Sequence, residues 1–139
     1  MVVGKKIQNV TNLEEILVCA NWITQNIKNS PEADDYLTRL LRNTDPNPKV
    51  TDSKSAIGKY LAEYVRVGAS PRVNFHLEAV ARVRAFFDDS MVIKPDHIKA
   101  VAKNVIVHRL VLKPGKEYKI SKEEVFEEIL RLTEMPPWN

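Results

Sequence analysis

A helix boundary near the middle of the chain constrains the fold more than any other feature of this sequence. The boundary lies in the segment Val67–Arg72. We expect Gly68 to close a preceding helix, because glycine tolerates the positive φ angle found at helix C-termini. Ser70 is a suitable N-cap for the next helix, and Pro71 fits the first helical position, where its missing N–H costs no hydrogen bond. The chain is therefore predicted to pass from one helix into another here.

Arg72 is the unusual residue of this boundary. A cation in the first turn of a helix faces the positive end of the helix dipole, which is mildly unfavourable. In one interpretation, the long side chain simply reaches into solvent. In the other, Arg72 and the helix N-terminus together bind an anion such as phosphate. The position alone does not decide between them.

Apolar residues recur at helical spacing along most of the remaining chain. The helix after the boundary is apolar over much of its circumference, so we expect it to be the most buried. Residues 91–93 are too few to assign, and no strand ladder is predicted. The fold class is an all-α bundle of five or six helices. Helices are predicted over about residues 12–28 and 71–87, and from about residues 31, 52, 95 and 121 onward.

Length and composition indicate a single globular domain. The chain has 139 residues, of which 44% are hydrophobic and 28% charged. No apolar run approaches the roughly 20 residues that span a bilayer, and the N-terminus lacks the apolar stretch of a signal peptide. We therefore expect a soluble, cytoplasmic protein. The single cysteine, Cys19, excludes an internal disulfide and is expected to be a small core residue.

The motifs of a nucleotide hydrolase are missing. The sequence contains no Gly-x-x-x-x-Gly-Lys-Ser/Thr loop that could cradle phosphates, and its four glycines lie far apart. It also has no apolar run ending in paired acids that could hold magnesium as a Walker B strand. We therefore predict that the chain alone does not hydrolyse ATP.

Other catalytic or metal-binding groups are also poorly supported. His76, His97 and His108 are separated by 21 and 11 residues, which is not a compact ligand motif, so no metal is predicted. The adjacent acids Asp88 and Asp89 fit a solvated loop better than acid–base catalysis. Cys19 has no neighbouring base that would make it a nucleophile. No catalytic residue is predicted.

Positive charge is concentrated late in the chain. Residues 94–122 contain eight Lys or Arg, against only Asp96 and Glu117. Such a stretch could face nucleic acid, an acidic partner or nucleotide phosphates, or it could be a solvated face. Tyr118 is its only aromatic residue, so a platform for stacked bases is poorly supported.

Three motifs in the second half of the chain resemble a known family. The segments Gly68–Arg72, Val92–Asp96 and Val105–Leu110 resemble, in the same order, the C-terminal lid of MoxR-type AAA+ ATPases. The resemblance is strongest over residues 68–110. Upstream it is weaker, where Asp35–Leu37 and Leu40–Thr44 look like the family's helix that ends in Thr-Arg.

The sequence departs from the family pattern at three places. Asp45 stands where the family usually has arginine, and Lys94 replaces a small hydroxyl residue before Pro-x-Asp. The segment Pro46–Val67 is longer and less typical than the usual connection.

The resemblance implies that residues 1–139 form one noncatalytic lid domain of a longer ATPase. In such proteins the lid covers the nucleotide and couples ATP hydrolysis to protein remodelling. Arg72 would then be the sensor 2 residue, which reaches toward the terminal phosphate. The isolated chain would need no cofactor, whereas ATP and Mg²⁺ are implied for the parent protein.

The implied partners are the AAA+ core of the same chain, neighbouring subunits of a ring, and client proteins, often with von Willebrand factor A domains. Nucleic acid is not an expected partner in this reading. The alternative is a helical binding module that contacts nucleic acid or a protein partner through residues 94–122.

Overall fold

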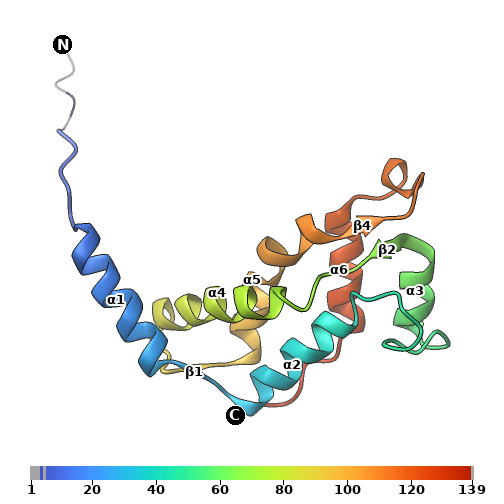
Figure 1. Ribbon diagram of the computed structural model, residues 1–139, viewed down its shortest axis with the longest axis horizontal. Helices are drawn as coiled ribbons and strands as arrows, with labels where there is room; N and C mark the ends of the chain where they lie inside the picture. The colour runs from blue at the N-terminus through green and yellow to red at the C-terminus, as the bar shows by residue number, and fades with distance from the viewer. Residues whose placement is uncertain (1–3, 5, 139) are drawn as a thin grey trace.

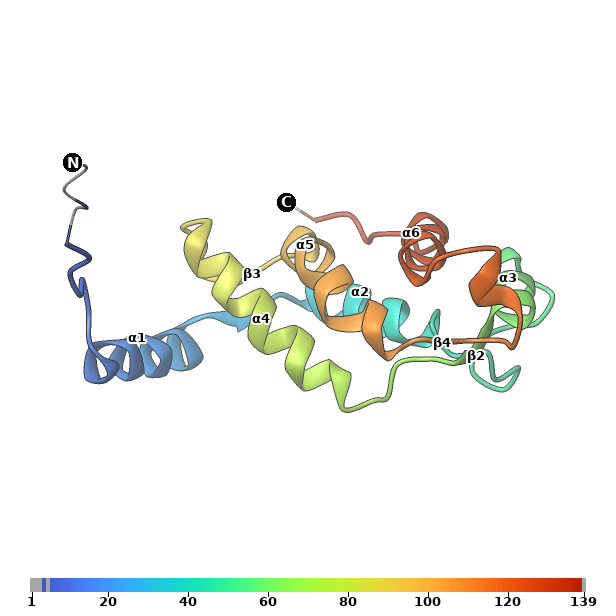
Figure 2. The ribbon, with the colours of Figure 1, turned by 90° about the horizontal axis from the view of Figure 1, so that it is seen from above.

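This computed structural model describes residue 4 and residues 6–138. More than half of these residues belong to six α-helices. They form an elongated bundle, with α1 extending from one end and α3 at the other (Figures 1 and 2). The predicted all-α class is confirmed. The helices are α1 (Leu13–Asn26), α2 (Pro31–Arg42), α3 (Ala56–Tyr64), α4 (Val73–Phe87), α5 (Pro95–Ile106) and α6 (Lys122–Leu132), with short 3₁₀ turns η1 (Val107–Arg109) and η2 (Lys116–Tyr118).

Two short strand pairs join the loops between helices. Strand β1 (Lys28–Asn29) runs parallel to β3 (Val92–Ile93). Strand β2 (Val65–Val67) runs antiparallel to β4 (Val111–Leu112). The sequence predicted no strand ladder, and two or three residues per strand are too few to give a recognisable alternation. Each pair nevertheless connects segments that are distant in sequence.

Hydroxyl and amide side chains cap several of the helices. In α2 the Ser30 hydroxyl accepts from the Ala33 N–H at 3.1 Å, and in α6 Ser121 and Glu124 form a capping box. Helix α1 is capped by Asn12. Helix α3 begins later than predicted, after a turn that ends at its N-cap, Ser55.

Helix α5, not α4, is the most buried helix of the described residues. Helix α5 packs against α2, α4 and α6. The apolar residues of α4 are spread around its circumference, and only one stripe of it faces the bundle; Phe75 and Phe87 are 72% and 75% exposed. The prediction that α4 would be the most buried is therefore wrong. The buried stripe of α4 consists of Val73, Leu77, Ala81 and Ala85, whereas α5 buries Pro95, His97, Ile98, Val101, Ala102, Val105 and Ile106.

Helix α1 contacts the bundle mainly through its C-terminal end. Ile23 and Ile27 are buried, but the preceding apolar side chains of α1 are exposed. Cys19 is exposed as well, so its predicted place in the core is wrong. The apolar residues around Cys19 are exposed as well. Helical spacing predicts that a helix has an apolar face, but it does not predict whether another element covers that face.

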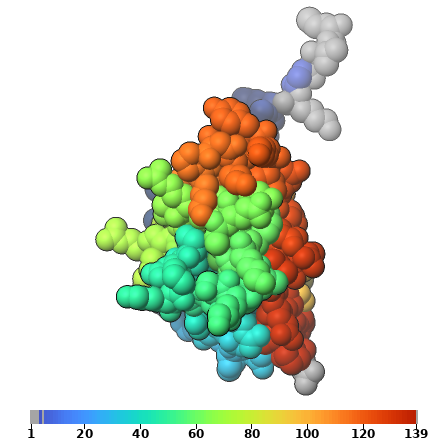
Figure 3. Space-filling view, turned by 90° about the vertical axis from the view of Figure 1, so that its right-hand side faces the viewer, coloured from blue at the N-terminus to red at the C-terminus, as the bar shows by residue number. Residues whose placement is uncertain are grey.

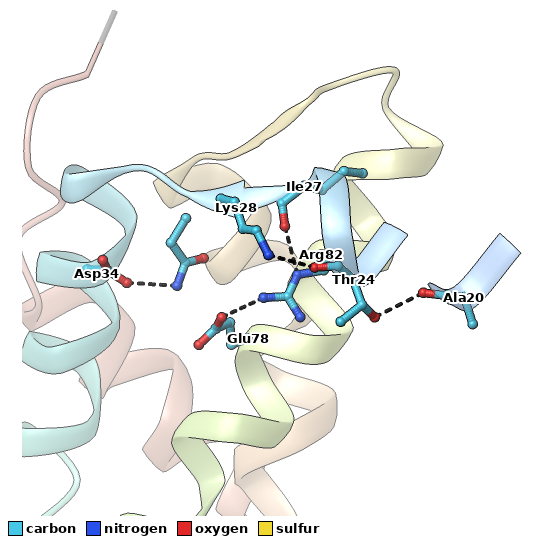
Figure 4. A network of polar contacts seen from close by, with 8 residues as sticks. Ala20, Thr24, Ile27, Lys28, Asp34, Glu78 and Arg82 are labelled. Atoms are coloured by element: carbon cyan, nitrogen blue, oxygen red, sulfur yellow. Dashed lines mark hydrogen bonds and ion pairs between the residues drawn. The ribbon is translucent and has the colours of Figure 1, made fainter. Parts of the chain in front are cut away.

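The side chain of Arg82 on α4 forms a hydrogen bond with the backbone at the C-terminal end of α1 (Figure 4). Its Nε donates to the Ile27 carbonyl at 2.9 Å, and its Nη2 forms an i,i+4 ion pair with Glu78 at 2.6 Å. This pair is partly buried, so it is screened less than a surface pair. The path of the chain from α1 into β1 is fixed by this contact.

The atypical segment between α2 and α3 folds back on the end of α2. The hydroxyl of Thr51 is buried and donates to the Arg42 carbonyl at 2.7 Å. Residues 42–67 form a continuous surface with the 113–120 turn and α6 (Figure 3). Gly58 is required in α3, because a Cβ there would lie 1.9 Å from the Asp52 carbonyl oxygen.

Replacing Leu77 with alanine should lower the free energy of unfolding by about 2–5 kcal/mol, because the side chain is fully buried between α4 and the bundle. Phe75→Ala, on the exposed side of the same helix, should change it by less than about 0.5 kcal/mol. Chemical denaturation of both variants measures the difference. Equal effects of the two substitutions would contradict this orientation of α4.

Candidate functional site

The segment before α4 is extended, not helical. Strand β2 precedes Gly68, so the predicted helix-to-helix boundary is wrong on its N-terminal side. Gly68 also lacks a positive φ angle. It is needed for a different reason: a Cβ at Gly68 would lie 2.1 Å from the Thr44 carbonyl oxygen. The close approach of two backbone segments therefore selects glycine here.

Thr44 holds the chain immediately before α4. Its side chain is buried, accepts from the Ala69 N–H at 3.1 Å and donates to the Leu41 carbonyl at 2.8 Å. One hydroxyl thus satisfies a backbone acceptor at the C-terminal end of α2 and a backbone donor before α4. The end of α2 and the approach to α4 are locked together.

Ser70 and Pro71 then initiate the helix. The Ser70 hydroxyl accepts from the Arg72 N–H at 3.3 Å, and the Ser70 carbonyl accepts from the Val73 N–H at 2.9 Å. The latter is an i to i+3 bond, so the first turn is of the 3₁₀ type and the regular helix begins at Val73. Ser70 therefore caps this first turn, but the N-cap of α4 itself is Arg72, which forms no side-chain cap hydrogen bond.

Arg72 leaves this turn as an exposed side chain. Its backbone is already helical, with φ −62° and ψ −23°. Among the described residues its guanidinium has no hydrogen-bond or ion-pair partner. The side chain is exposed, and its starting point is fixed by the three residues before it. A hollow next to Pro71 is lined by Thr38, Leu41, Arg42, Asp45, Val50, Ala69 and Asn74.

Comparison with known proteins identifies the family of this domain. The AAA lid domain family matches residues 59–129, slightly more than half of the chain. The chain belongs to the AAA lid domain family. The matched region runs from α3 to α6 and contains the whole start of α4.

A solved structure supports the same assignment. A protein of Cytophaga hutchinsonii that is assigned as an ATPase is 27% identical and superimposes with a TM-score of 0.76. The match covers 89% of this chain but only 36% of that protein, so the lid spans about a third of its length. No curated protein matches the sequence.

The basic segment of the lid does not form one free cationic face. Most of its long side chains already contact groups of the same chain. Lys103 lies 3.4 Å from Glu127, Lys116 lies 3.6 Å from Glu63, and Lys113 donates to the Ala62 carbonyl. Lys94 lies over the Trp138 ring, 4.6 Å from its centroid, and Arg109 donates to the Val105 carbonyl.

These contacts reduce the charge that residues 94–122 can offer to nucleic acid. The structure therefore gives no specific support to the alternative of a nucleic-acid-binding module.

The three histidines occupy different surroundings. His76 contacts Arg109, His108 is exposed, and His97 is buried at the start of α5. Within residues 4 and 6–138 no three His, Cys, Asp or Glu side chains come close enough to hold a metal ion. Of the acids at the end of α4, Asp88 pairs with Arg84 at 3.0 Å and Asp89 adopts a φ of 54°, so both belong to the helix end.

No helix among the described residues has the length and apolarity needed to cross a bilayer.

The contact of His76 with Arg109 was not predicted. These residues are 33 positions apart, and neither belongs to a pattern that would pair them.

His97 acts as a neutral cap. Its Nδ1 accepts from the Lys94 N–H at 3.0 Å, and its Nε2 lies 3.6 Å from Asp88. Burial lowers the pKa of His97; the cations of Lys94 and Arg84 act in the same direction, whereas Asp88 and Asp96 oppose them. Protonation of Nδ1 would remove the acceptor that satisfies the start of α5.

Replacing Gly68 with alanine should destabilise the lid by about 1–3 kcal/mol, because the added methyl group would collide with the Thr44 carbonyl. Hydrogen exchange of the Ala69 amide should accelerate at the same time. Gly4→Ala is the control, since a Cβ there meets no atom within 4 Å. Unchanged stability and exchange in Gly68→Ala would show that this contact does not fix the start of α4.

The lid should lose stability as the pH falls from about 7 through about 6.5, the pKa of an unfolded histidine. The folded-state pKa of His97 is lower, so in this range the unfolded chain binds more protons and acid favours unfolding. The loss should be complete below the folded-state pKa. His97→Gln keeps an acceptor that does not titrate, and its melting temperature should depend less on pH. His108→Gln, which changes an exposed histidine, should retain the dependence of the parent sequence.

Proposed function

We propose that this chain is the lid of a MoxR-type AAA+ ATPase and that Arg72 is its sensor 2 residue. The observation that carries the proposal is an exposed arginine without a partner among the described residues, at a helix start that Thr44, Gly68 and Ser70 fix. The family match, the similarity to a protein assigned as an ATPase and the resemblance of three ordered motifs support it.

The chemistry of the start of α4 suits a phosphate. Arg72 has a planar group of donors, and the first turn of α4 contains no acidic residue. A cation placed against the helix dipole is unfavourable alone, and an approaching anion would compensate for it. In the proposed parent the AAA+ core holds ATP and Mg²⁺, and the lid supplies a charge that senses the terminal phosphate.

The exposed apolar residues of α1 and α4 support a second contact of the lid. A hollow between these helices is lined by Val18, Cys19, Trp22 and Phe86, together with polar residues of the start of α1. Large exposed apolar patches usually mark interaction surfaces. We infer that the AAA+ core of the parent or a neighbouring subunit of a ring covers this patch. A second hollow between the same helices adds Ile16, Val83 and Phe87.

Such an ATPase would be cytoplasmic and would remodel client proteins, including proteins with von Willebrand factor A domains. The lid itself would bind no metal and perform no catalytic step. Its contribution would be to change its contacts with the nucleotide between the ATP-bound and hydrolysed states.

In the full-length ATPase that contains this lid, Arg72→Ala should lower ATP turnover about 100- to 1,000-fold, the range found when a positioned charge-stabilising group is lost. Arg72→Lys should restore turnover only in part, because lysine keeps the charge but not the planar donors. Neither substitution should change the melting temperature of the lid appreciably, since the side chain is exposed.

Arg84→Ala is the matched control, because Arg84 is an exposed arginine of the same helix whose charge Asp88 already neutralises. It should leave turnover nearly unchanged. A large loss of lid stability in Arg72→Ala, combined with normal turnover, would show that Arg72 is structural and would refute the assignment.

A further inference from the structure

Arg109 is held in place by two neutral acceptors. Its Nη1 donates to the Val105 carbonyl at 3.2 Å, and its Nη2 lies 3.0 Å from the Nδ1 of His76. The side chain is only half-buried. Because neither acceptor carries a negative charge, these contacts orient the guanidinium group without neutralising it. Three of its five N–H donors remain available.

Half of the arginines, unlike Arg109, are neutralised by a carboxylate. Four of the eight form an ion pair with a carboxylate three or four residues away on the same helix or at its end: Arg39 with Asp35, Arg82 with Glu78, Arg84 with Asp88 and Arg131 with Glu128. Within the described part of the chain, Arg109 has no such partner, and neither do Arg42, Arg66 and Arg72.

The arginines without a carboxylate gather around the start of α4. Arg42 lines the hollow beside Pro71, and Arg66 lines a neighbouring one beside Gly68. Asp45 lies in both hollows, but within the described residues it forms no ion pair, and its carboxylate accepts from the Asn47 N–H. The single carboxylate of Asp45 therefore offsets only part of the positive charge of Arg42, Arg66 and Arg72 at this end of the lid.

His76 connects Arg109 to the side of α4 from which Arg72 leaves. Residues four apart on a helix lie on the same side, so His76 follows Arg72 one turn further along α4. Arg109 reaches His76 from η1, which follows α5. Two guanidinium groups without a carboxylate partner thus lie on the same side of this helix. Like charges on one side repel, and a bound anion would relieve that repulsion.

We propose that Arg109, oriented by His76, is a second phosphate-contacting residue beside Arg72, so that the two guanidinium groups together bind the terminal phosphates of a nucleoside triphosphate. This inference rests on the proposed function of Arg72 and extends it to a residue from another element. Two planar donor groups can engage oxygens of adjacent phosphates, which one arginine cannot do with the same geometry.

His76 is the positioning residue of this pair. Because its Nδ1 accepts from Arg109, the neutral ring carries its proton on Nε2. The ring therefore fixes one edge of the guanidinium group of Arg109 and adds no negative charge. A carboxylate at this position would hold Arg109 equally well but would cancel the charge that phosphate requires.

The test uses the 139-residue chain and inorganic tripolyphosphate as the probe. Carbon-detected NMR of the arginine Cζ atoms follows each guanidinium group, at a pH above the ordinary pKa of histidine. The signals of Arg72 and Arg109 should shift with the same midpoint. Arg109→Gln should weaken the binding reported by Arg72 about three- to fivefold, which corresponds to the upper half of the range for an exposed charge pair. Arg84→Gln should leave the midpoint unchanged.

Substitutions of His76 separate positioning from simple charge. His76→Ala should weaken tripolyphosphate binding and broaden the Arg109 signal, whereas His76→Asn, which retains a neutral acceptor, should restore most of the affinity. The backbone amide spectrum of each variant shows whether the fold is intact. A shift of Arg72 alone, no shift of either arginine, or an unchanged midpoint in Arg109→Gln would overturn the proposal.

The full-length ATPase distinguishes this failure from failure of the proposed function. If Arg72→Ala abolishes turnover while Arg109→Gln leaves it unchanged, the lid assignment stands and the second phosphate contact is refuted. If Arg72→Ala also has no effect, the proposed function itself fails.

Discussion

The close contact between the C-terminal end of α2 and the backbone before α4 determines the geometry of the whole candidate site. Gly68 lets the chain approach the Thr44 carbonyl, and the Thr44 hydroxyl receives the Ala69 N–H. Thr44 is buried, so its hydroxyl and carbonyl cannot exchange these contacts for water at low cost. The position of the first turn of α4 therefore depends on a contact with Thr44, a residue more than twenty positions earlier in the sequence. This contact fixes where the Arg72 side chain begins, although that side chain itself makes no contact that holds the fold.

The sequence predicted the elements of this fold better than their burial. Ser30 and Ser121 mark helix starts through local hydrogen bonds, and Pro95 does so through its fixed φ at the first helical position; both signals depend only on residues close in sequence. Burial depends on what another element covers. Phe75 and Phe87 widen the apolar face of α4, yet the narrow stripe of Leu77 and two alanines faces the bundle. No periodicity within one helix could reveal this choice.

The candidate site was predictable to a similar extent. The sequence shows that Arg72 follows Ser70 and Pro71 at the start of a helix, and its exposure is consistent with that position. Gly68 was identified as essential for the wrong reason, because the sequence cannot distinguish a positive φ angle from a close backbone approach. The contact of His76 with Arg109 joins two elements through tertiary packing and leaves no local signal. Counting charged residues along the sequence suggested a basic stretch over residues 94–122. In the fold, lysines of this stretch pair with separate acidic residues and do not form one surface.

Helix α4 connects two surfaces of different chemistry. Its first turn carries unneutralised positive charge, whereas its last turns present Val83, Phe86 and Phe87 next to the exposed face of α1. An apolar contact is nondirectional and nearly indifferent to the charge of a distant ligand, whereas a guanidinium contact changes strongly when a phosphate is lost. In the proposed ATPase, the apolar end would keep the lid attached through the cycle, and the cationic end would respond to hydrolysis. Because a packed helix of 15 residues moves as one body, a change of contact at Arg72 would be transmitted to the apolar end. Only the difference in affinity between the two nucleotide states can drive such a motion, and in the proposed ATPase that difference would reside in the arginines around the start of α4.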